Sequence, residues 1–312
     1  MKIVPVAFDS FGVRSMATMV VTKDVRIFID PGAALGPTRY GLPPRKEELL
    51  ALEASKKLII KHARKCDVII VTHYHYDHHP YPEDTKLYGV FEDKHVLCKH
   101  ISKDVNLSGK QRGKIFYEKV REIAREVEFA DNRALELGGT KIEISPAVWH
   151  GDVGSKVGKV VMVCVKEKDC TFVFGSDAQG LADPNALKWF MKRNPDIAII
   201  DGYPTIFLGW RMSARNFERS KENLRQAIRK TRVKKVVLDH HIVRDVNYRE
   251  KIKEVFEAAS ESNKQVLTAA EFYGLDNLFL EAWRNKLGRE IKVSVEGYYR
   301  KLSSRISRLA SL

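Results

Sequence analysis

The chain has 312 residues, and its hydrophobic share of 44% excludes an intrinsically disordered protein. No stretch is long and apolar enough for a membrane-spanning helix, and four cysteines without CxxC spacing argue against a thiolate zinc site or a disulfide framework. A net charge of +14 favours anionic partners, and a charged share of 30% with only four glutamines is also typical of heat-adapted surfaces. We therefore expect a soluble, cytoplasmic protein of thermophilic character, without a membrane partner.

The first third of the chain predicts strands followed by one long helix. Residues 16–22 and 25–30 are rich in β-branched and apolar side chains and predict a hairpin. A helix is expected over 45–64, after two prolines. The apolar run 66–72 is typical of a strand buried on both faces, and it leads directly into the histidine-rich segment 73–79.

The remaining sequence alternates between strand and helix patterns. A polar loop at 109–114 precedes a predicted helix at 114–126, and further helices are expected at 182–193, 214–230, 252–262 and 268–288. Short strands are predicted at 140–148, 158–168, 170–177, 195–201 and 233–239. This alternation indicates a layered α/β fold. We expect residues 1–252 to form the main domain, and residues 253–312 a basic helical extension packed on it.

The segment from His73 to His79, HYHYDHH, contains four histidines and one aspartate directly after the predicted buried strand. His73 and His75 alternate in an extended segment and point the same way, so both can bind one metal ion. Asp77 and His78 lie beyond a turn and can bind a second divalent ion that keeps a position open for water. The segment therefore predicts a metal centre at a strand end. For His79, a packing role is as well supported as a ligand role.

The HxHxDH word after an apolar strand resembles the signature of the metallo-β-lactamase fold superfamily. Four further elements of that pattern occur in the expected order: an early aspartate, a lone mid-chain histidine, a later aspartate and a final histidine, at Asp30, His150, Asp177 and His240 or His241. The resemblance implies a four-layer αββα sandwich with the metals at one edge of two mixed sheets. Residues 197–241 are most similar to archaeal members and to the sugar-phosphate lactonase-like and phosphodiesterase-like branch.

By this resemblance, two divalent ions are held by histidines and aspartates and are bridged by Asp177. The first ion would be bound by three histidines, and the second by one aspartate and two histidines: His73, His75 and His150, then Asp77, His78 and His240. His241 is the alternative to His240. Asp30 and His79 would lie behind the ligands, where an aspartate that accepts a histidine N–H fixes the tautomer of the ring.

The implied activity is hydrolysis by a hydroxide that bridges the two ions, with zinc expected first and iron or manganese as alternatives. Asp77 and Asp177 would be the catalytic carboxylates, Asp77 by taking a proton. Phosphodiesters, esters and lactones are the expected substrates, with β-lactams as a broader activity. Two alternatives stay open: an iron-dependent redox enzyme similar to the sulfur dioxygenase branch, and an RNA-processing or RNA-binding factor that uses its basic segments.

Three side chains after predicted strand ends are candidates for binding substrate: Tyr203, Arg211 and Arg244. A guanidinium group binds phosphate or carboxylate through two parallel hydrogen bonds. We therefore expect an anionic small molecule, including nucleotide-like compounds, as the partner of this site, with nucleic acid as the alternative.

Overall fold

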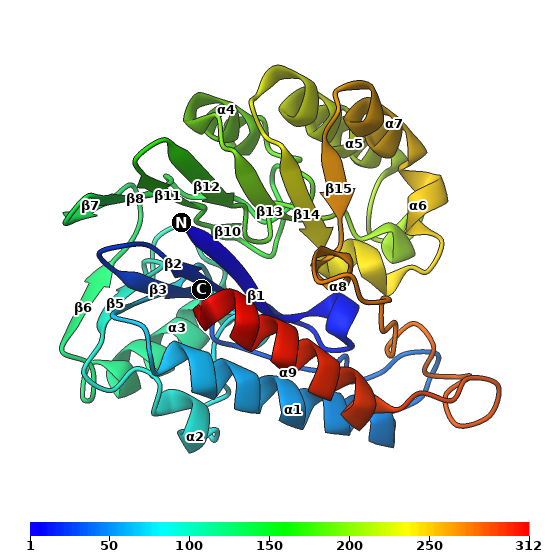
Figure 1. Cartoon of the computed structure of the whole chain (residues 1–312), viewed down its shortest axis with the longest axis horizontal. Helices are drawn as coiled ribbons and strands as arrows, with labels where there is room; N and C mark the ends of the chain where they lie inside the picture. Colours follow the sequence, from blue (N-terminus) through cyan, green and yellow to red (C-terminus); the bar gives the residue numbers. More distant parts are fainter. Residues whose placement is uncertain (312) are drawn as a thin grey trace.

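Two mixed β-sheets form the inner layers of the molecule, and helices cover both outer faces (Figure 1). The computed structural model describes residues 1–311. The four-layer αββα sandwich predicted from the sequence is confirmed by this arrangement. This arrangement matters for function because parallel strands of both sheets end along the same edge of the sandwich.

The first sheet is built from the amino-terminal half of the chain. Its strands follow sequence order: β1 (Lys2–Phe8), β2 (Met16–Val21), β3 (Arg26–Ile29), β4 (Val68–Val71), β5 (His95–Cys98) and β6 (Glu126–Phe129). The β1–β2–β3 pairs are antiparallel and the β3–β4–β5–β6 pairs are parallel. All four residues of β4 are buried, as an uninterrupted apolar run requires.

The second sheet is built from the carboxy-terminal half. Across the sheet its strands are β15 (Gln265–Leu267), β14 (Lys235–Asp239), β13 (Ile197–Asp201), β12 (Cys170–Phe174), β11 (Val163–Glu167), β8 (Thr140–Ile144) and β7 (Ala134–Leu137). The pairs from β12 to β15 are parallel. Two short strands between β8 and β11 in the chain, β9 (Val148–Trp149) and β10 (Lys159–Val160), form an antiparallel pair.

Side chains of the second sheet alternate between two cores, as the period of a strand requires. Phe172 and Phe174 of β12 belong to the core shared with the first sheet, whereas Val173 belongs to the core beneath the outer helices. The helices on that side are α4 (Pro184–Arg193), α5 (Ala214–Lys230), α6 (Tyr248–Lys251) and α7 (Lys253–Glu261). The first sheet is covered by α1 (Lys46–Ala63), α2 (Thr85–Tyr88), α3 (Leu107–Val120) and α9 (Val295–Ser311).

The predicted carboxy-terminal extension contacts both halves of the sandwich. Helix α7 packs on α5, and β15 adds a strand beside β14. After the short α8 (Ala269–Phe272), the chain crosses to the other side, where α9 lies against α1 and β1 (Figure 1). The extension therefore includes one strand of the second sheet in addition to its helices.

Helix α3 begins earlier than predicted. Residues 109–114 are helical, because the Asn106 side chain accepts a hydrogen bond from the Gly109 N–H and caps the first turn. Gly113 lowers helix propensity, but a Cβ atom there would lie 2.7 Å from the Tyr74 ring. The glycine that suggested a loop is thus required for close packing of α3 against the histidine-rich segment.

The helix predicted over 268–288 is wrong beyond its first turn. Helix α8 ends at Phe272, and Gly274 adopts a positive φ of 64°. The following backbone bonds to distant parts of the chain instead, since the Leu278 N–H donates to the Ser10 carbonyl. Tertiary contacts here override the local helical pattern.

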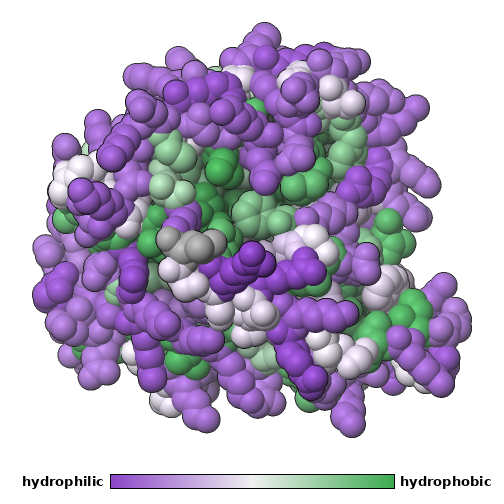
Figure 2. Space-filling view, viewed as in Figure 1, coloured by the Kyte–Doolittle hydropathy of each residue, from purple (hydrophilic) through white to green (hydrophobic). Residues whose placement is uncertain are grey.

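None of the helices in residues 1–311 is both long and apolar enough to span a bilayer. Figure 2 shows hydrophilic residues over most of the face seen in Figure 1.

A buried ion pair holds the segment after α8 to the start of α1. The Arg284 side chain is 0% exposed, and its Nε and Nη2 donate to the Glu48 carboxylate at 2.8 and 2.7 Å. The same guanidinium donates to the carbonyl oxygens of Leu42 and Gly36. Arg284 therefore ties three separate segments together.

We expect Arg284→Met to lower the free energy of unfolding by about 3–5 kcal/mol, because it leaves the Glu48 carboxylate buried without its partner. Denaturant unfolding of this variant beside Arg289→Met, which changes an exposed arginine, measures the difference. Equal stability of the two variants would contradict the structural role given to Arg284.

Candidate metal centre

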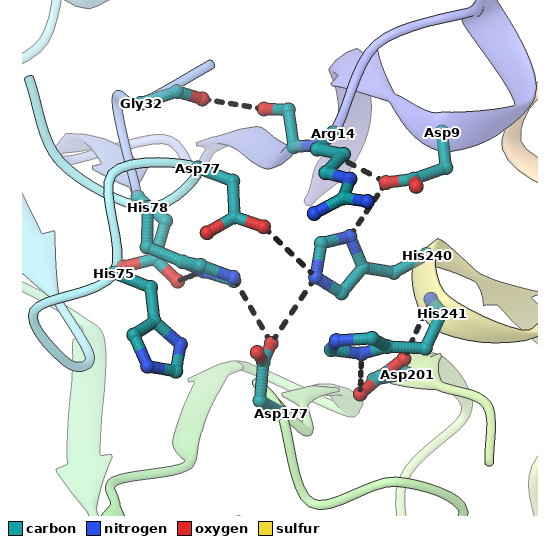
Figure 3. Close-up of polar contacts among 12 residues, drawn as sticks. Asp9, Arg14, Gly32, His75, Asp77, His78, Asp177, Asp201, His240 and His241 are labelled. Atoms are coloured by element: carbon teal, nitrogen blue, oxygen red, sulfur yellow. Dashed lines mark hydrogen bonds and ion pairs between the residues drawn. The ribbon is translucent and has the colours of Figure 1, made fainter. Parts of the chain in front are cut away.

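Side chains predicted to bind metal converge at the edge where parallel strands of both sheets end. His73 follows β4, Asp177 follows β12 and His240 follows β14. In an α/β sheet the carboxyl ends of strands are the usual position of a functional site. Figure 3 shows Asp77, His78, Asp177 and His240 pointing toward one another across this edge.

One group of ligand atoms comes from three histidines and Asp177. The donor atoms of His73, His75, His150 and Asp177 all lie within 4.8 Å of one another. His73 Nε2 is 3.0 Å from His75 Nδ1, and His150 Nε2 is 3.0 Å from Asp177 Oδ2. Three imidazoles and one carboxylate make a donor set suited to a divalent transition metal.

A second group contains Asp77, His78 and His240. His240 Nε2 lies 3.6 Å from Asp77 Oδ2 and 3.7 Å from Asp177 Oδ1, and His78 Nε2 lies 3.0 Å from the same Asp177 oxygen. Asp177 Oδ2 therefore faces the first group and Oδ1 faces the second. This is the arrangement required of a bridging carboxylate.

Several of these atoms make no hydrogen bond of acceptable geometry, although they lie as close as 3.0 Å to one another. Within residues 1–311, the unpaired buried atoms include Nε2 of His78, Nε2 of His150 and both carboxylate oxygens of Asp177. Buried polar atoms without partners are rare in proteins, because their desolvation is costly. Because His150 Nε2 and Asp177 Oδ2 lie in the first group, and His78 Nε2 and Asp177 Oδ1 lie beside the second, the residues present fit divalent cations at both positions.

The Asp30 carboxylate lies against the His78 ring. Its Oδ2 accepts from His78 Nδ1 at 2.8 Å, and the backbone N–H and hydroxyl of Thr72 donate to its carboxylate. Only Nε2 of His78 is then left to face the cluster. Gly32 permits this packing, because a Cβ atom there would lie 2.3 Å from the His79 backbone nitrogen.

Two further aspartates orient the late histidines, and neither was predicted as part of the site. Asp9 Oδ1 accepts from His240 Nδ1 at 2.6 Å, and Asp201 Oδ2 accepts from His241 Nδ1 at 2.8 Å. Both follow or end a strand, which was the signal available in the sequence. His240 has a φ of 64°, and its ring lies in the group of Asp77 and His78. His241 also approaches Asp177 and stays its alternative.

His79 lies behind the histidine-rich segment. Its ring is buried among the rings of Tyr74, Tyr76 and Phe116, with centroid separations of 5.7, 5.2 and 5.4 Å. Burial lowers the pKa of His79 to about 3. This histidine therefore packs in an aromatic cluster, and its predicted role of orienting a ligand is not supported by a hydrogen bond to any of the predicted ligands.

The charges of the cluster attract protons to two histidines. Burial opposes the charged form of His240, yet Asp9 and Asp177 raise its pKa to about 10. The pKa of His78 is raised well above its usual value, because Asp177 and Asp30 outweigh burial. In contrast, burial and the charge of His78 lower the pKa of His73 to about 4. The aspartates around the cluster thus favour positive charge at His78 and His240 but not at His73.

A cleft of about 800 Å³ opens beside the cluster. Its lining includes His75, Asp77, His150 and His241, so the predicted metal groups form one wall. This volume is within the usual range for small-molecule sites.

The three predicted substrate-binding residues differ in position. Arg211 and Arg244 line the cleft, but the Tyr203 side chain is 1% exposed and its hydroxyl donates to Asp152. The prediction for Tyr203 is corrected: the residue holds Asp152 at the cleft wall, because its ring packs against Phe217 in the core under α5. Arg244 is itself tied to the site, since its Nε donates to Asp9 Oδ2 at 2.7 Å.

The fold and this ordered set of histidines and aspartates define the class of the protein: it has the metallo-β-lactamase fold. The metallo-β-lactamase fold protein YhfI from Bacillus subtilis matches 89% of this chain and 97% of its own, with a TM-score of 0.51 and 13% identity. An isothiocyanate hydrolase from Delia radicum gut bacteria matches 86% and 95%, with a TM-score of 0.50 and 14% identity. At these identities the similarity establishes the fold alone.

The chain belongs to the UPF0282 family. It is 39% identical to the UPF0282 protein of Methanopyrus kandleri over 298 residues, which cover 93% of this chain and 100% of the relative. Identity to the UPF0282 protein of Thermococcus gammatolerans is 41% over 305 residues, which cover 95% and 98%. No family model matches the chain. The predicted fold and the predicted similarity to archaeal proteins are confirmed.

Metal content distinguishes the two late histidines. We expect His240→Ala to lower the zinc content of the reconstituted protein from two ions per chain to about one, because it removes a donor from the group of Asp77 and His78. His241→Ala, whose ring nitrogen is tied to Asp201, should retain two. Mass spectrometric metal analysis after dialysis measures both, and the reverse pattern would make His241 the ligand.

Proposed function

We propose that this protein is a metal-dependent hydrolase with two divalent ions, zinc before iron or manganese, whose substrates are phosphodiesters and, more broadly, esters and lactones. The observation that carries the proposal is the position of Asp177. Its two oxygens face separate groups of ligand atoms, and neither oxygen has a hydrogen-bond partner within residues 1–311. A structural zinc site needs only four ligands around one ion, and this cluster offers more.

Within this proposal each side chain has a defined task. The first ion would be held by His73, His75 and His150, the second by Asp77, His78 and His240, with Asp177 between them. Two ions so held would lower the pKa of a bound water and would polarise a substrate oxygen. No serine or cysteine nucleophile is then required.

Asp77 is the ligand carboxylate that also lines the cleft. Its Oδ2 lies 3.6 Å from His240 Nε2 and 3.6 Å from Arg244 Nη2. Although burial opposes it, His78 and His240 lower the pKa of Asp77, so this side chain stays a carboxylate that can accept a hydrogen bond from a reacting water in the proton-transfer role proposed for it. Arg244 is held by Asp9 and is placed to stabilise negative charge that develops on the substrate.

The charges around the cleft favour a phosphodiester over a neutral ester or lactone. Cationic side chains line it from both halves of the chain, and its carboxylates are limited to Asp77 and Asp152 in the described residues. A neutral substrate would gain little from this lining, whereas an anion would be attracted to it.

Metal-loaded protein should hydrolyse bis(p-nitrophenyl) phosphate, and Asp177→Asn should reduce kcat/KM by at least about a hundredfold, since the isosteric amide removes the bridging charge. Release of p-nitrophenol is followed spectrophotometrically. Asp169→Ala, an exposed carboxylate far along the sheet, serves as the matched control and should keep full activity.

Treatment with a chelator should abolish the same activity, and zinc or manganese should restore it. Lactone and β-lactam substrates are assayed in parallel. Turnover of lactones or β-lactams alone would change the proposed substrate class but would leave the proposed metal chemistry unchanged. Phosphodiester hydrolysis that survives in both chelated protein and Asp177→Asn would contradict the proposed function.

A further inference from the structure

More cationic side chains line the cleft beside the metal centre than the proposed hydrolysis requires. Five cationic side chains line it: Arg14, Arg112, Lys156, Arg211 and Arg244. Two of these charges are already matched inside the protein. Arg14 forms a two-point ion pair with Glu281, with both N–O distances 2.7 Å, and Arg244 is paired with Asp9 at 2.7 Å.

The other three cations have no ion pair with any residue in 1–311: Arg112, Lys156 and Arg211. They come from separate parts of the fold. Arg112 is on α3, Lys156 is in the loop between β9 and β10, and Arg211 follows β13. Uncompensated charges that converge on one cleft from three elements attract an anion more strongly than cations scattered over the surface.

Arg112 is held in place by stacking. Its guanidinium lies over the Tyr76 ring at 4.8 Å from the centroid, and Tyr76 stacks on Tyr81 at 4.0 Å with an interplanar angle of 22°. Its Nη1 also approaches the Tyr74 carbonyl at 3.4 Å. A guanidinium fixed by stacking loses less freedom when it binds an anion.

The same histidine-rich segment determines the positions of both the predicted metal ligands and Arg112. Within HYHYDHH the two tyrosines alternate with His73 and His75, so the tyrosines contact α3 while the histidines face the metal groups. Gly113, next to Arg112, lets α3 approach the Tyr74 ring. The position of Arg112 relative to the metal centre is therefore fixed by local packing.

We propose that Arg112, Lys156 and Arg211 form a subsite for a second phosphate group, remote from the bond that is cleaved. The substrate is then a small molecule that carries a phosphodiester and a terminal phosphate monoester. A monoester has a charge near −2 at neutral pH, which matches several unpaired cations better than a carboxylate does. This inference rests on the proposed function and assigns its substrate class.

The test compares two substrates with the same reacting bond and leaving group. Thymidine 5′-(p-nitrophenyl phosphate) lacks a second phosphate, and its 3′-phosphorylated derivative carries one. The wild-type, metal-loaded protein should show a KM about tenfold lower for the 3′-phosphorylated compound, as expected for charge-assisted hydrogen bonds to one phosphate. Arg112→Gln should reduce this ratio to about twofold or less.

Lys114→Gln is the matched control, because Lys114 is an exposed cation on the same helix and does not line the cleft. It should keep the wild-type ratio. Thermal unfolding of each variant separates loss of binding from loss of folding. Equal KM values for both substrates in the wild type, or an equal loss of the ratio in Lys114→Gln and Arg112→Gln, would overturn the subsite.

A binding measurement tests the subsite independently of hydrolysis. Calorimetric titration compares thymidine 3′,5′-bisphosphate with thymidine 5′-monophosphate, and the bisphosphate should bind about tenfold more tightly to wild type but not to Arg112→Gln. Absence of hydrolysis with this difference intact would contradict the proposed function alone. Hydrolysis of both substrates without the difference would contradict the subsite alone.

Discussion

The Asp177 carboxylate is buried at the edge where both sheets end, and a buried charge without partners is strongly destabilising. The histidines that lie within ion-pair distance of this carboxylate come from both halves of the sandwich. His78 approaches from the loop after β4, and His150 and His240 approach from the second half of the chain. Because each half supplies charges that the other needs, the geometry of the site and the packing of the two sheets depend on each other.

The fold could be predicted because local and tertiary requirements agree over most of the chain. The apolar run of β4 is buried as its composition requires, and the helix predicted over 45–64 forms over Lys46–Ala63. The wrong predictions fall where the local sequence pattern and the tertiary contacts disagree. Gly113 indicates a loop, yet it allows a helix to pack on Tyr74, and the helical pattern after Phe272 gives way to bonds with Ser10 and Glu48.

For the site, the residues that could be predicted are those with a distinctive spacing. The histidine-rich segment and the isolated residues Asp30, His150 and Asp177 match an ordered pattern, and the structure brings them together. Asp9 and Asp201 could not be singled out, because one aspartate at a strand end is common in any sequence. Arg112 could not be selected from the sequence, because its position depends on tertiary packing against Tyr76, 36 positions earlier in the chain.

The contacts between the first strand's end and the late chain also constrain how the protein is made. Asp9 meets His240, Ser10 meets Ala270 and Arg14 meets Glu281, across separations of 231, 260 and 267 positions. Such distant pairings are slow to form and require nearly the whole chain. On the ribosome, the histidine-rich segment emerges long before the residues that complete its surroundings. The group of side chains around Asp177 is therefore incomplete until the segment that contains His240 has been made.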